Sequence, residues 1–191
     1  MTEFHKNKWM AGYPETISGS GSMVQNTENI RSALPEIFKK YDIKSFFDAP
    51  CGDRNWIKHV DFQGIDYHAG DIVPEIIEDL NMPEAKVFDI REDEPPNVDL
   101  WFCRDCLYHL SDDDIWDSIN NMRDSEIKYF LITSHTEDNI NHPENRSIQT
   151  GGFRCLILKQ YDYFDLPEPI EVFPDYDKKD LREEMLLFKV R

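Results

Sequence analysis

The sequence is poor in basic residues, and this deficit excludes one large class of partners. Its 191 residues include 21 lysines and arginines against 38 aspartates and glutamates, which gives a formal net charge of −17 at neutral pH. The basic residues form no cluster along the chain, whereas proteins that bind nucleic acid need a basic face to meet the phosphate backbone. We therefore expect no nucleic acid among its partners.

The sequence also lacks long apolar runs and a cysteine framework. A membrane-spanning helix needs about 20 consecutive apolar residues, and the sequence shows neither such a run nor a signal peptide, which predicts a cytoplasmic protein without membrane contact. The pair Cys103-x-x-Cys106 has no second cysteine or histidine pair to complete a zinc site. Cys51 and Cys155 stand alone, so we expect four reduced thiols and assign no metal ligand.

What the sequence does contain is the alternation of a nucleoside-binding βαβ unit. Hydrophobic residues make up 40% of the chain and charged residues 31%, which is typical of one soluble globular domain. The central stretch predicts a buried strand, a tight turn, the opening of a helix, a second strand and a late acid: Ser45–Ala49, Pro50–Asp53, Asn55–Val60, Gly64–Tyr67 and Asp71. In such a unit the glycine turn approaches the ligand, and the late carboxylate accepts hydrogen bonds from ribose hydroxyls.

The turn itself indicates which cofactor is bound. A dinucleotide site needs three glycines in the pattern G-x-G-x-x-G, so that a pyrophosphate can rest on a helix N-terminus. This turn has only Gly52, and Asp53 would repel a pyrophosphate. Together with Asp48 at the end of the first strand, Asp53 suits a cationic ligand with an amino group. The turn therefore argues against NAD and favours S-adenosylmethionine (SAM), which carries a sulfonium and an α-amino group.

Two motifs resemble those of class I SAM-dependent methyltransferases: D-A-P-C-G-D followed by N-W at residues 48–56, and G-I-D-Y-H-A-G-D-I-V at residues 64–73. The first is similar to the motif of a bacterial D-x-P-C-G-D subgroup that often modifies small molecules or glycans. The resemblance extends from about Ser18 to the C-terminus. It implies an α/β fold, a Rossmann-like three-layer sandwich with a seven-stranded, mostly parallel sheet whose last strand is antiparallel. It also implies SAM as cofactor and S-adenosylhomocysteine (SAH) as product.

The N-terminal 26 residues contain the run Ser18-Gly19-Ser20-Gly21-Ser22. Such a run is by itself typical of a flexible linker. The resemblance places an S-G-x-G-S run here, so we expect Ser18, Gly19 and Ser22 to contact the SAM carboxylate or to close over the cofactor. Trp9 and Tyr13 form a lid or pack on the domain. We thus predict a cofactor-closing segment over residues 1–26 and a single SAM-binding domain over residues 27–191.

Hydrophobic patterns predict the remaining elements. Thr27 begins a helix that reaches about Lys40 and that Pro35 would kink or divide. Further helices are predicted over Val73–Leu80 and after Ser111, and the segment Tyr161–Tyr176 is predicted as a packed loop. Strands are expected within Lys86–Ile90, Val98–Leu110, Glu126–Thr133, Cys155–Lys159 and Met185–Val190.

The cofactor contacts are predicted along the carboxyl ends of the first strands. Asp89 and its neighbour Ile90 are expected at the adenine, as the resemblance implies, although Asp89 could equally cap its own loop. The full predicted set of cofactor-binding residues in the domain is Asp48, Pro50, Gly52, Asp53, Trp56, Asp71, Ile72, Asp89, Ile90 and Arg104.

Catalytic candidates follow the fourth and fifth strands, where open α/β sheets place their ligands. Imidazole titrates near neutral pH, so His135 is the first candidate for a general base, followed by Asp105 and His109, and each could instead be structural. These three side chains could converge on a metal, but their spacing does not require one. Arg104 and Arg154 either hold an anionic substrate or form salt bridges.

The predicted function is SAM-dependent methyl transfer to the oxygen of a small polar acceptor, such as a sugar or glycan precursor. N-methylation of a small amine and a regulatory module that binds SAM or SAH without turnover are the alternatives. The chain has no D/N-P-P-Y/F run of the amino-directed nucleic-acid methyltransferases. The expected partner is a small-molecule substrate. The sequence does not decide whether the protein forms a homodimer.

Overall fold

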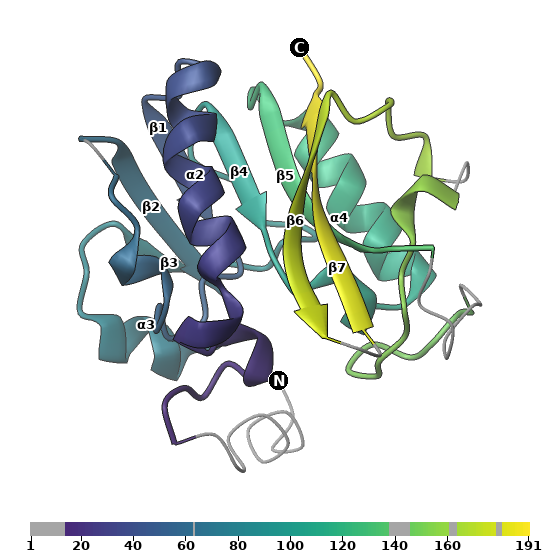
Figure 1. Ribbon diagram of the computed structural model, residues 1–191, viewed down its shortest axis with the longest axis horizontal. Coiled ribbons are helices and arrows are strands. Elements are labelled where there is room, and N and C mark those ends of the chain that lie inside the picture. The colour runs from purple at the N-terminus through teal and green to yellow at the C-terminus, as the bar shows by residue number, and fades with distance from the viewer. Residues whose placement is uncertain (1–13, 63, 138–145, 161–163, 179–180) are drawn as a thin grey trace.

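The computed structural model describes residues 14–62, 64–137, 146–160, 164–178 and 181–191. Seven strands form one sheet with the order β3-β2-β1-β4-β5-β7-β6 (Figure 1). Strands β1 to β5 run parallel, β7 pairs antiparallel with β5, and β6 pairs antiparallel with β7. Their bounds are Ser45–Asp48 (β1), Asp66–Asp71 (β2), Ala85–Val87 (β3), Leu100–Cys103 (β4), Tyr129–His135 (β5), Glu171–Lys178 (β6) and Leu181–Lys189 (β7).

Helices cover the two faces of this sheet and complete three layers. Helix α2 (Glu28–Lys40) lies on one face and α4 (Asp112–Asp124) on the other, as Figure 1 shows, while α3 (Pro74–Leu80) sits beside β2 and β3. Successive strand residues point to opposite faces. Phe46 accordingly packs with α2, and its neighbour Phe47 lies in the cluster that packs on α4. The predicted Rossmann-like three-layer sandwich, with its last strand antiparallel, is confirmed.

The sixth predicted strand is wrong. Cys155, Leu156 and Ile157 are buried but belong to no strand, and a 3-10 turn, η5 (Leu158–Gln160), follows them. Because β7 occupies the edge of β5, no ladder position is left for this apolar run. It is held instead beside the end of β5, where the His135 N–H donates to the Leu156 carbonyl over 2.8 Å.

The strand that does occupy the sheet edge, β6, begins within the segment Tyr161–Tyr176 that was predicted as a packed loop and continues two residues beyond it. Pro174 lies inside it and the ladder to β7 shifts register between Pro174 and Asp177. Proline is tolerated at a sheet edge because one side of that strand needs no ladder hydrogen bonds. Because proline and acidic residues are uncommon in strands, the sequence pattern predicted a loop where the structure has an edge strand.

Two helix predictions also need correction. The segment Asn55–Val60 forms only one 3-10 turn, η3 (Ile57–His59), and not the opening of an α-helix. Helix α2 continues through Pro35 as one helix, with Ile30, Leu34 and Ile37 buried on its inner face. This packing offsets the hydrogen bond that proline cannot make. Among the described residues, none of the helices has the length and apolar character needed to traverse a bilayer.

Candidate functional site

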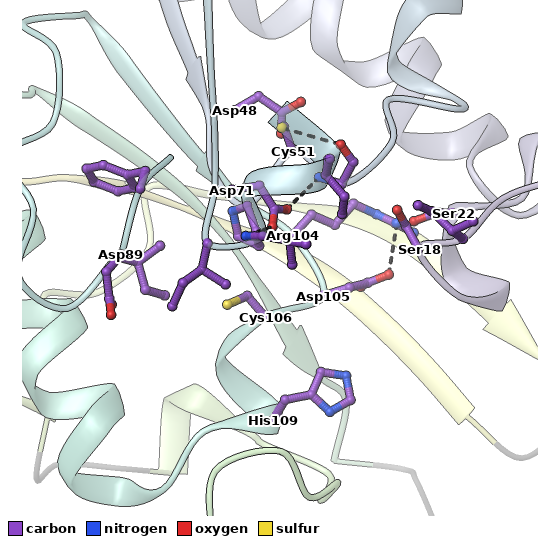
Figure 2. A pocket seen from close by; sticks show the side chains of 18 of the residues that line it. Ser18, Ser22, Asp48, Cys51, Asp71, Asp89, Arg104, Asp105, Cys106 and His109 are labelled. Carbon is purple, nitrogen blue, oxygen red and sulfur yellow. Dashed lines mark hydrogen bonds and ion pairs between the residues drawn. The ribbon is translucent and has the colours of Figure 1, made fainter. Parts of the chain in front are cut away.

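A cavity of about 660 Å³ opens at the carboxyl ends of β1, β2 and β4. This is the edge where β1 and β4, adjacent in the sheet but not in the chain, continue to opposite sides, and open α/β sheets bind ligands at such switch points. Figure 2 shows the side chains that converge there. Of the predicted site residues, the lining includes Ser18, Ser22, Asp48, Pro50, Gly52, Trp56, Asp71, Ile72, Asp89, Ile90, Arg104, Asp105 and His109.

The turn after β1 is fixed by the last residue of β2. The Gly52 N–H donates to Asp71 Oδ2 over 3.0 Å, and the Val73 N–H donates to Asp71 Oδ1, also over 3.0 Å. Gly52 has a φ of +54°, which favours glycine, and a Cβ there would lie 2.4 Å from Ser18 Oγ. Position 52 thus requires glycine, both for its backbone conformation and for the close approach of Ser18.

Beneath the turn, Asp48 is buried and accepts a hydrogen bond from the Tyr67 hydroxyl over 2.6 Å. Burial raises the pKa of Asp48 to about 7, while the Tyr67 hydrogen bond lowers it. The Ala49–Pro50 peptide bond is cis. Asp48 therefore lies at the cavity as a carboxyl group that a nearby cation would hold in its charged form.

Asp53 holds the N-terminal segment and does not line the cavity. Its Oδ2 accepts hydrogen bonds from the Thr16 hydroxyl over 2.8 Å and from the Ile17 N–H over 2.9 Å. Ser18 Oγ donates to Asp53 Oδ1 over 3.1 Å and accepts from the Asp53 N–H over 2.9 Å. Gly19 also lies outside the lining. The described part of residues 1–26 is thereby fixed to the turn, whereas Trp9 and Tyr13 lie outside the described residues.

At the other end of the cavity, Asp89 is engaged by a neighbouring arginine. Both of its carboxylate oxygens accept from the Arg91 side chain, over 2.9 and 2.6 Å, and Arg91 also pairs with Asp114 over 2.8 Å. The Arg91 hydrogen bonds lower the pKa of Asp89. Ile72 and Ile90 add apolar side chains to the cavity wall at this end.

Arg104 is buried at the centre of an acidic group. Its Nε and Nη2 donate to the two oxygens of Asp175 over 2.7 and 3.2 Å. Its Nη1 donates to Asp105 Oδ2 over 2.9 Å, a contact drawn in Figure 2. Burial lowers the pKa of Arg104, but Asp105 and Asp175 outweigh burial and raise it overall. The guanidinium lies 5.3 Å from the Trp56 ring centre. Arg104 thus lines the cavity as an already neutralised cation.

The two candidate histidines lie in different surroundings. His109 lines the cavity, and its Nδ1 lies 2.7 Å from the Gly152 carbonyl. A carbonyl only accepts, so Nδ1 carries the proton and Nε2 is the acceptor nitrogen of the neutral ring. His135 is fully buried outside the lining, and its Nδ1 accepts from the Leu156 N–H over 3.1 Å. Only His109 lies where a substrate in the cavity could reach it.

The sequence analysis did not identify several residues at or beside the cavity. Asp175 and Glu183 lie behind Asp105, and Glu183 shares the inward face of β7 with Met185. An acid two residues before Met185, and therefore on the same face of the strand as Met185 and Leu187, was the signal that could have revealed Glu183. Thr150 and Gly151, from the polar loop after β5, also line the cavity.

Arg154, predicted either to hold an anionic substrate or to form a salt bridge, is buried and pairs with Asp112. It also donates to the carbonyls of Leu110 and Arg146 over 3.0 and 2.9 Å. Its guanidinium therefore links Asp112, the first residue of α4, to the carbonyls of Leu110 and Arg146 inside the protein.

No protein-family model matches the sequence, and no curated protein matches it. In structure the chain is similar to a SAM-dependent methyltransferase from Clostridium acetobutylicum, with a TM-score of 0.65 and 10% identity over 89% of this chain and 95% of that chain. It is also similar to the N-methyltransferase NodS from Bradyrhizobium japonicum in complex with SAH, with a TM-score of 0.61 and 11% identity over 84% and 85% of the two chains.

A third similar structure is 1,6-didemethyltoxoflavin-N1-methyltransferase from Burkholderia thailandensis, with bound 1,6-didemethyltoxoflavin and SAH. Its TM-score is 0.62, with 14% identity over 86% of this chain and 79% of that chain. At these identities the likeness establishes a fold and not an activity. The chain has the Rossmann-like fold of these methyltransferases, and membership of the D-x-P-C-G-D subgroup stays a prediction.

Proposed function

We propose that this protein is a SAM-dependent methyltransferase of a small neutral or cationic acceptor. The observation that carries the proposal is the Gly52 turn, fixed by the Asp71 carboxylate and opening onto the cavity at the switch point of the sheet. The shared fold of proteins named as methyltransferases supports it. The acceptor atom that we favour is nitrogen, because of the charge of the site.

The residues of the cavity fit SAM. Each oxygen of Asp71 accepts one backbone N–H and keeps a second lone pair that a ribose hydroxyl could use. Asp48 and the bare backbone at Gly52 suit the amino acid end of SAM, and Ile72 and Ile90 suit the adenine ring. When bound, SAM supplies an electrophilic methyl group, whose bond to sulfur breaks as sulfur keeps the electron pair.

The charge of the cavity wall disfavours an anionic acceptor. Both arginines of the lining, Arg91 and Arg104, are already paired with aspartates. The lining also contains six acids: Asp48, Asp71, Glu75, Asp79, Asp89 and Asp105. Like charges repel strongly where water is scarce, so a uronate or phosphorylated sugar would bind poorly. A small amine fits better than the sugar oxygen predicted from sequence, although a neutral hydroxyl remains compatible with the wall.

We assign proton transfer to His109. Its Nδ1 is held by the Gly152 carbonyl, so that Nε2 can take a proton from the acceptor nitrogen. A cationic amine must lose that proton before its lone pair can attack the methyl carbon, and a neutral amine loses it as the new bond forms. Asp105, which also lines the cavity, would orient the acceptor N–H or O–H through its carboxylate. His135 was the first candidate from sequence, but its burial outside the lining leads us to assign the base to His109.

The first experiment is calorimetric titration with SAM, SAH and NAD in parallel. We expect saturable binding of SAM and SAH and none of NAD. A folded protein that binds neither SAM nor SAH would overturn the proposal. Incubation with SAM and a panel of amines and sugars then tests turnover, measured as SAH formed together with methylated product. Binding without turnover on any acceptor would favour the regulatory module instead.

Two histidine variants separate the candidates for the base. His109→Gln keeps a hydrogen-bond donor but no titratable nitrogen, and should lower turnover by about 10²-fold or more with little change in SAM affinity. His135→Gln is the matched control and should act through stability, measured by urea unfolding. A fully folded His135→Gln enzyme that loses turnover, together with a His109→Gln enzyme that keeps it, would return the role to His135.

A further inference from the structure

Three acids from three parts of the chain meet behind the cavity wall. A carboxylate oxygen from each of Asp105, Asp175 and Glu183 lies within 4.8 Å of the other two. Asp175 and Glu183 are buried, and Asp105 lines the cavity. One guanidinium, Arg104, faces the group and bonds Asp175 and Asp105. A single cation cannot balance three ionised carboxylates at this depth, so at least one of them is neutral.

The hydrogen bonds indicate which acid is neutral. Arg104 bonds both oxygens of Asp175 and one oxygen of Asp105, so these two carboxylates are the ionised pair. The Oδ1 of Asp105 is buried and has no hydrogen-bond partner among the described residues. Glu183 has no bond to Arg104 in the described structure. Its side chain is 4% exposed, and its Oε1 lies 3.4 Å from His135 Nε2.

His135 completes this pattern as a donor. Its Nδ1 accepts the Leu156 N–H, so the proton of the neutral imidazole is on Nε2, the nitrogen that faces Glu183 Oε1. One Glu183 oxygen is thus offered a donor. A carboxylate oxygen of Glu183 also lies within 4.8 Å of one oxygen of Asp105, the residue whose buried Oδ1 has no donor among the described residues. A proton on Glu183 supplies the hydrogen-bond donor that the buried Asp105 oxygen lacks, directly or through one bridging water.

We propose that Glu183 is a protonated positioning residue whose carboxyl O–H holds the buried oxygen of Asp105. Arg104 holds the other oxygen of Asp105, so the carboxylate is fixed from both sides at the cavity wall. Asp105 needs this support because its φ of +54° is unfavourable for a residue with a side chain. The His135–Glu183–Asp105 chain would set the geometry with which Asp105 orients an acceptor.

A proton explains the cluster better than a metal ion. Three carboxylate ligands of one cation would suit Mg²⁺ or Mn²⁺, but the Arg104 guanidinium bonds two of these same three groups. A divalent cation would have to displace it and would lie beside a second buried positive charge. The pKa of Glu183 agrees with a proton, since burial, followed by the charge of Asp105, raises it to about 9.

Stability against pH tests the protonation without any assumption about activity. The folded pKa of Glu183 lies above its ordinary value of 4.5, so its contribution to stability is complete below about pH 4.5 and is lost as the pH rises through about 9. The groups that face it are Arg104, Asp105, Tyr108, His135, Cys155 and Asp175. They remain in the variants, so the comparison isolates Glu183.

We expect the urea midpoint of the wild type to fall more steeply between about pH 6 and about pH 9 than that of Glu183→Gln. Glu184→Gln is the same substitution at the neighbouring residue, which is paired with Lys159, and its midpoint should fall as that of the wild type does. Parallel curves for the wild type and Glu183→Gln would overturn the proposal. Infrared difference spectra of the wild type give a second measurement, a protonated carboxyl band that disappears near pH 9.

Turnover and metal addition complete the test. The turnover measurement rests on the proposed function, whereas the stability measurement does not, so the two can fail separately. At neutral pH Glu183→Gln should retain most turnover, because its amide can donate to Asp105, while Glu183→Leu should lose about 10²-fold. Equal turnover in Glu183→Leu would contradict the positioning role. A rise in the wild-type midpoint on adding Mg²⁺ or Mn²⁺, absent in Glu183→Gln, would place a metal there and overturn the proposal.

Discussion

The Asp71 carboxylate is shared between the backbone of the protein and the ribose that we propose it binds. Asp71→Asn replaces one acceptor oxygen by an NH₂ group, which cannot accept from Gly52 or Val73. Losing a hydrogen bond to a charged group weakens binding by about 1.5–3 kcal/mol, so SAM affinity should fall by about 10- to 100-fold in calorimetry. Asp66→Asn, on the exposed start of β2, is the control. Unchanged SAM affinity in Asp71→Asn would contradict the ribose assignment.

Two glycines with similar backbones separate conformational strain from close contact. Gly52 and Gly64 have φ values of +54° and +82°, but an added Cβ meets Ser18 Oγ at 2.4 Å in the first case and nothing within 4 Å in the second. Gly64→Ala should therefore lose only about 1 kcal/mol of unfolding free energy, from backbone strain. Gly52→Ala should lose more and should also weaken SAM binding. Equal losses of unfolding free energy in the two variants would show that Ser18 moves aside for the new Cβ without destabilising the protein.

Among the elements, the sequence predicts best where periodicity and topology agree. The apolar runs of β1, β4 and β5 are short, lie between turns and are buried on both faces of a parallel sheet, which makes them easy to recognise. The run from Cys155 to Leu158 is equally apolar, yet it is not a strand, because the edge of β5 is already taken by β7. Periodicity detects burial, but only the whole sheet decides which buried segments pair.

In the candidate site, too, the residues within one local unit could be predicted, and those brought together by distant strands could not. Gly52 and Asp71 could be placed from their spacing alone, since the parallel pairing of β1 and β2 brings them together at one sheet edge. Asp175 and Glu183 could not, because they meet Asp105 only through the pairing of β6 and β7 beside β5. His135 was chosen for its residue type at a strand end, and that choice could not include the burial of its ring. Local sequence patterns do not predict contacts between strands that are distant in the chain.

Asp53 is the side chain that accepts most of the hydrogen bonds between the turn and the segment before η1 (Ser20–Ser22), while Asn55 and Arg104 donate to the Ser22 and Gly21 carbonyls. Asp53 accepts from Thr16, Ile17 and Ser18, so Asp53→Ala should release this segment while leaving the sheet intact. Hydrogen–deuterium exchange should become faster over residues 14–22 and stay unchanged in β4 and β5. Asp117→Ala, exposed on α4, is the control. Unchanged exchange in Asp53→Ala would mean that other contacts hold the segment, and the predicted closing role would lose its anchor.

For the molecule as a whole, the net charge of −17 and the acidic cavity wall act together on a cationic cofactor. SAM carries a sulfonium that SAH lacks, so the field of the protein attracts the cofactor more than the product. Raising the ionic strength from about 0.01 M to about 0.15 M shortens the Debye length from about 30 Å to about 8 Å, and should weaken SAM binding about threefold with a much smaller effect on SAH.

Calorimetry with both ligands at the two salt concentrations measures this difference. Asp79→Asn, which removes one acid of the cavity wall, should reduce the salt dependence of SAM binding, whereas Asp117→Asn, on the exposed side of α4, should not. Equal salt dependence for SAM and SAH would mean that the acids of the wall are screened or protonated in the bound state. The preference for a cationic acceptor, which rests on the same wall, would then lose its electrostatic basis, and a neutral hydroxyl would become the better candidate.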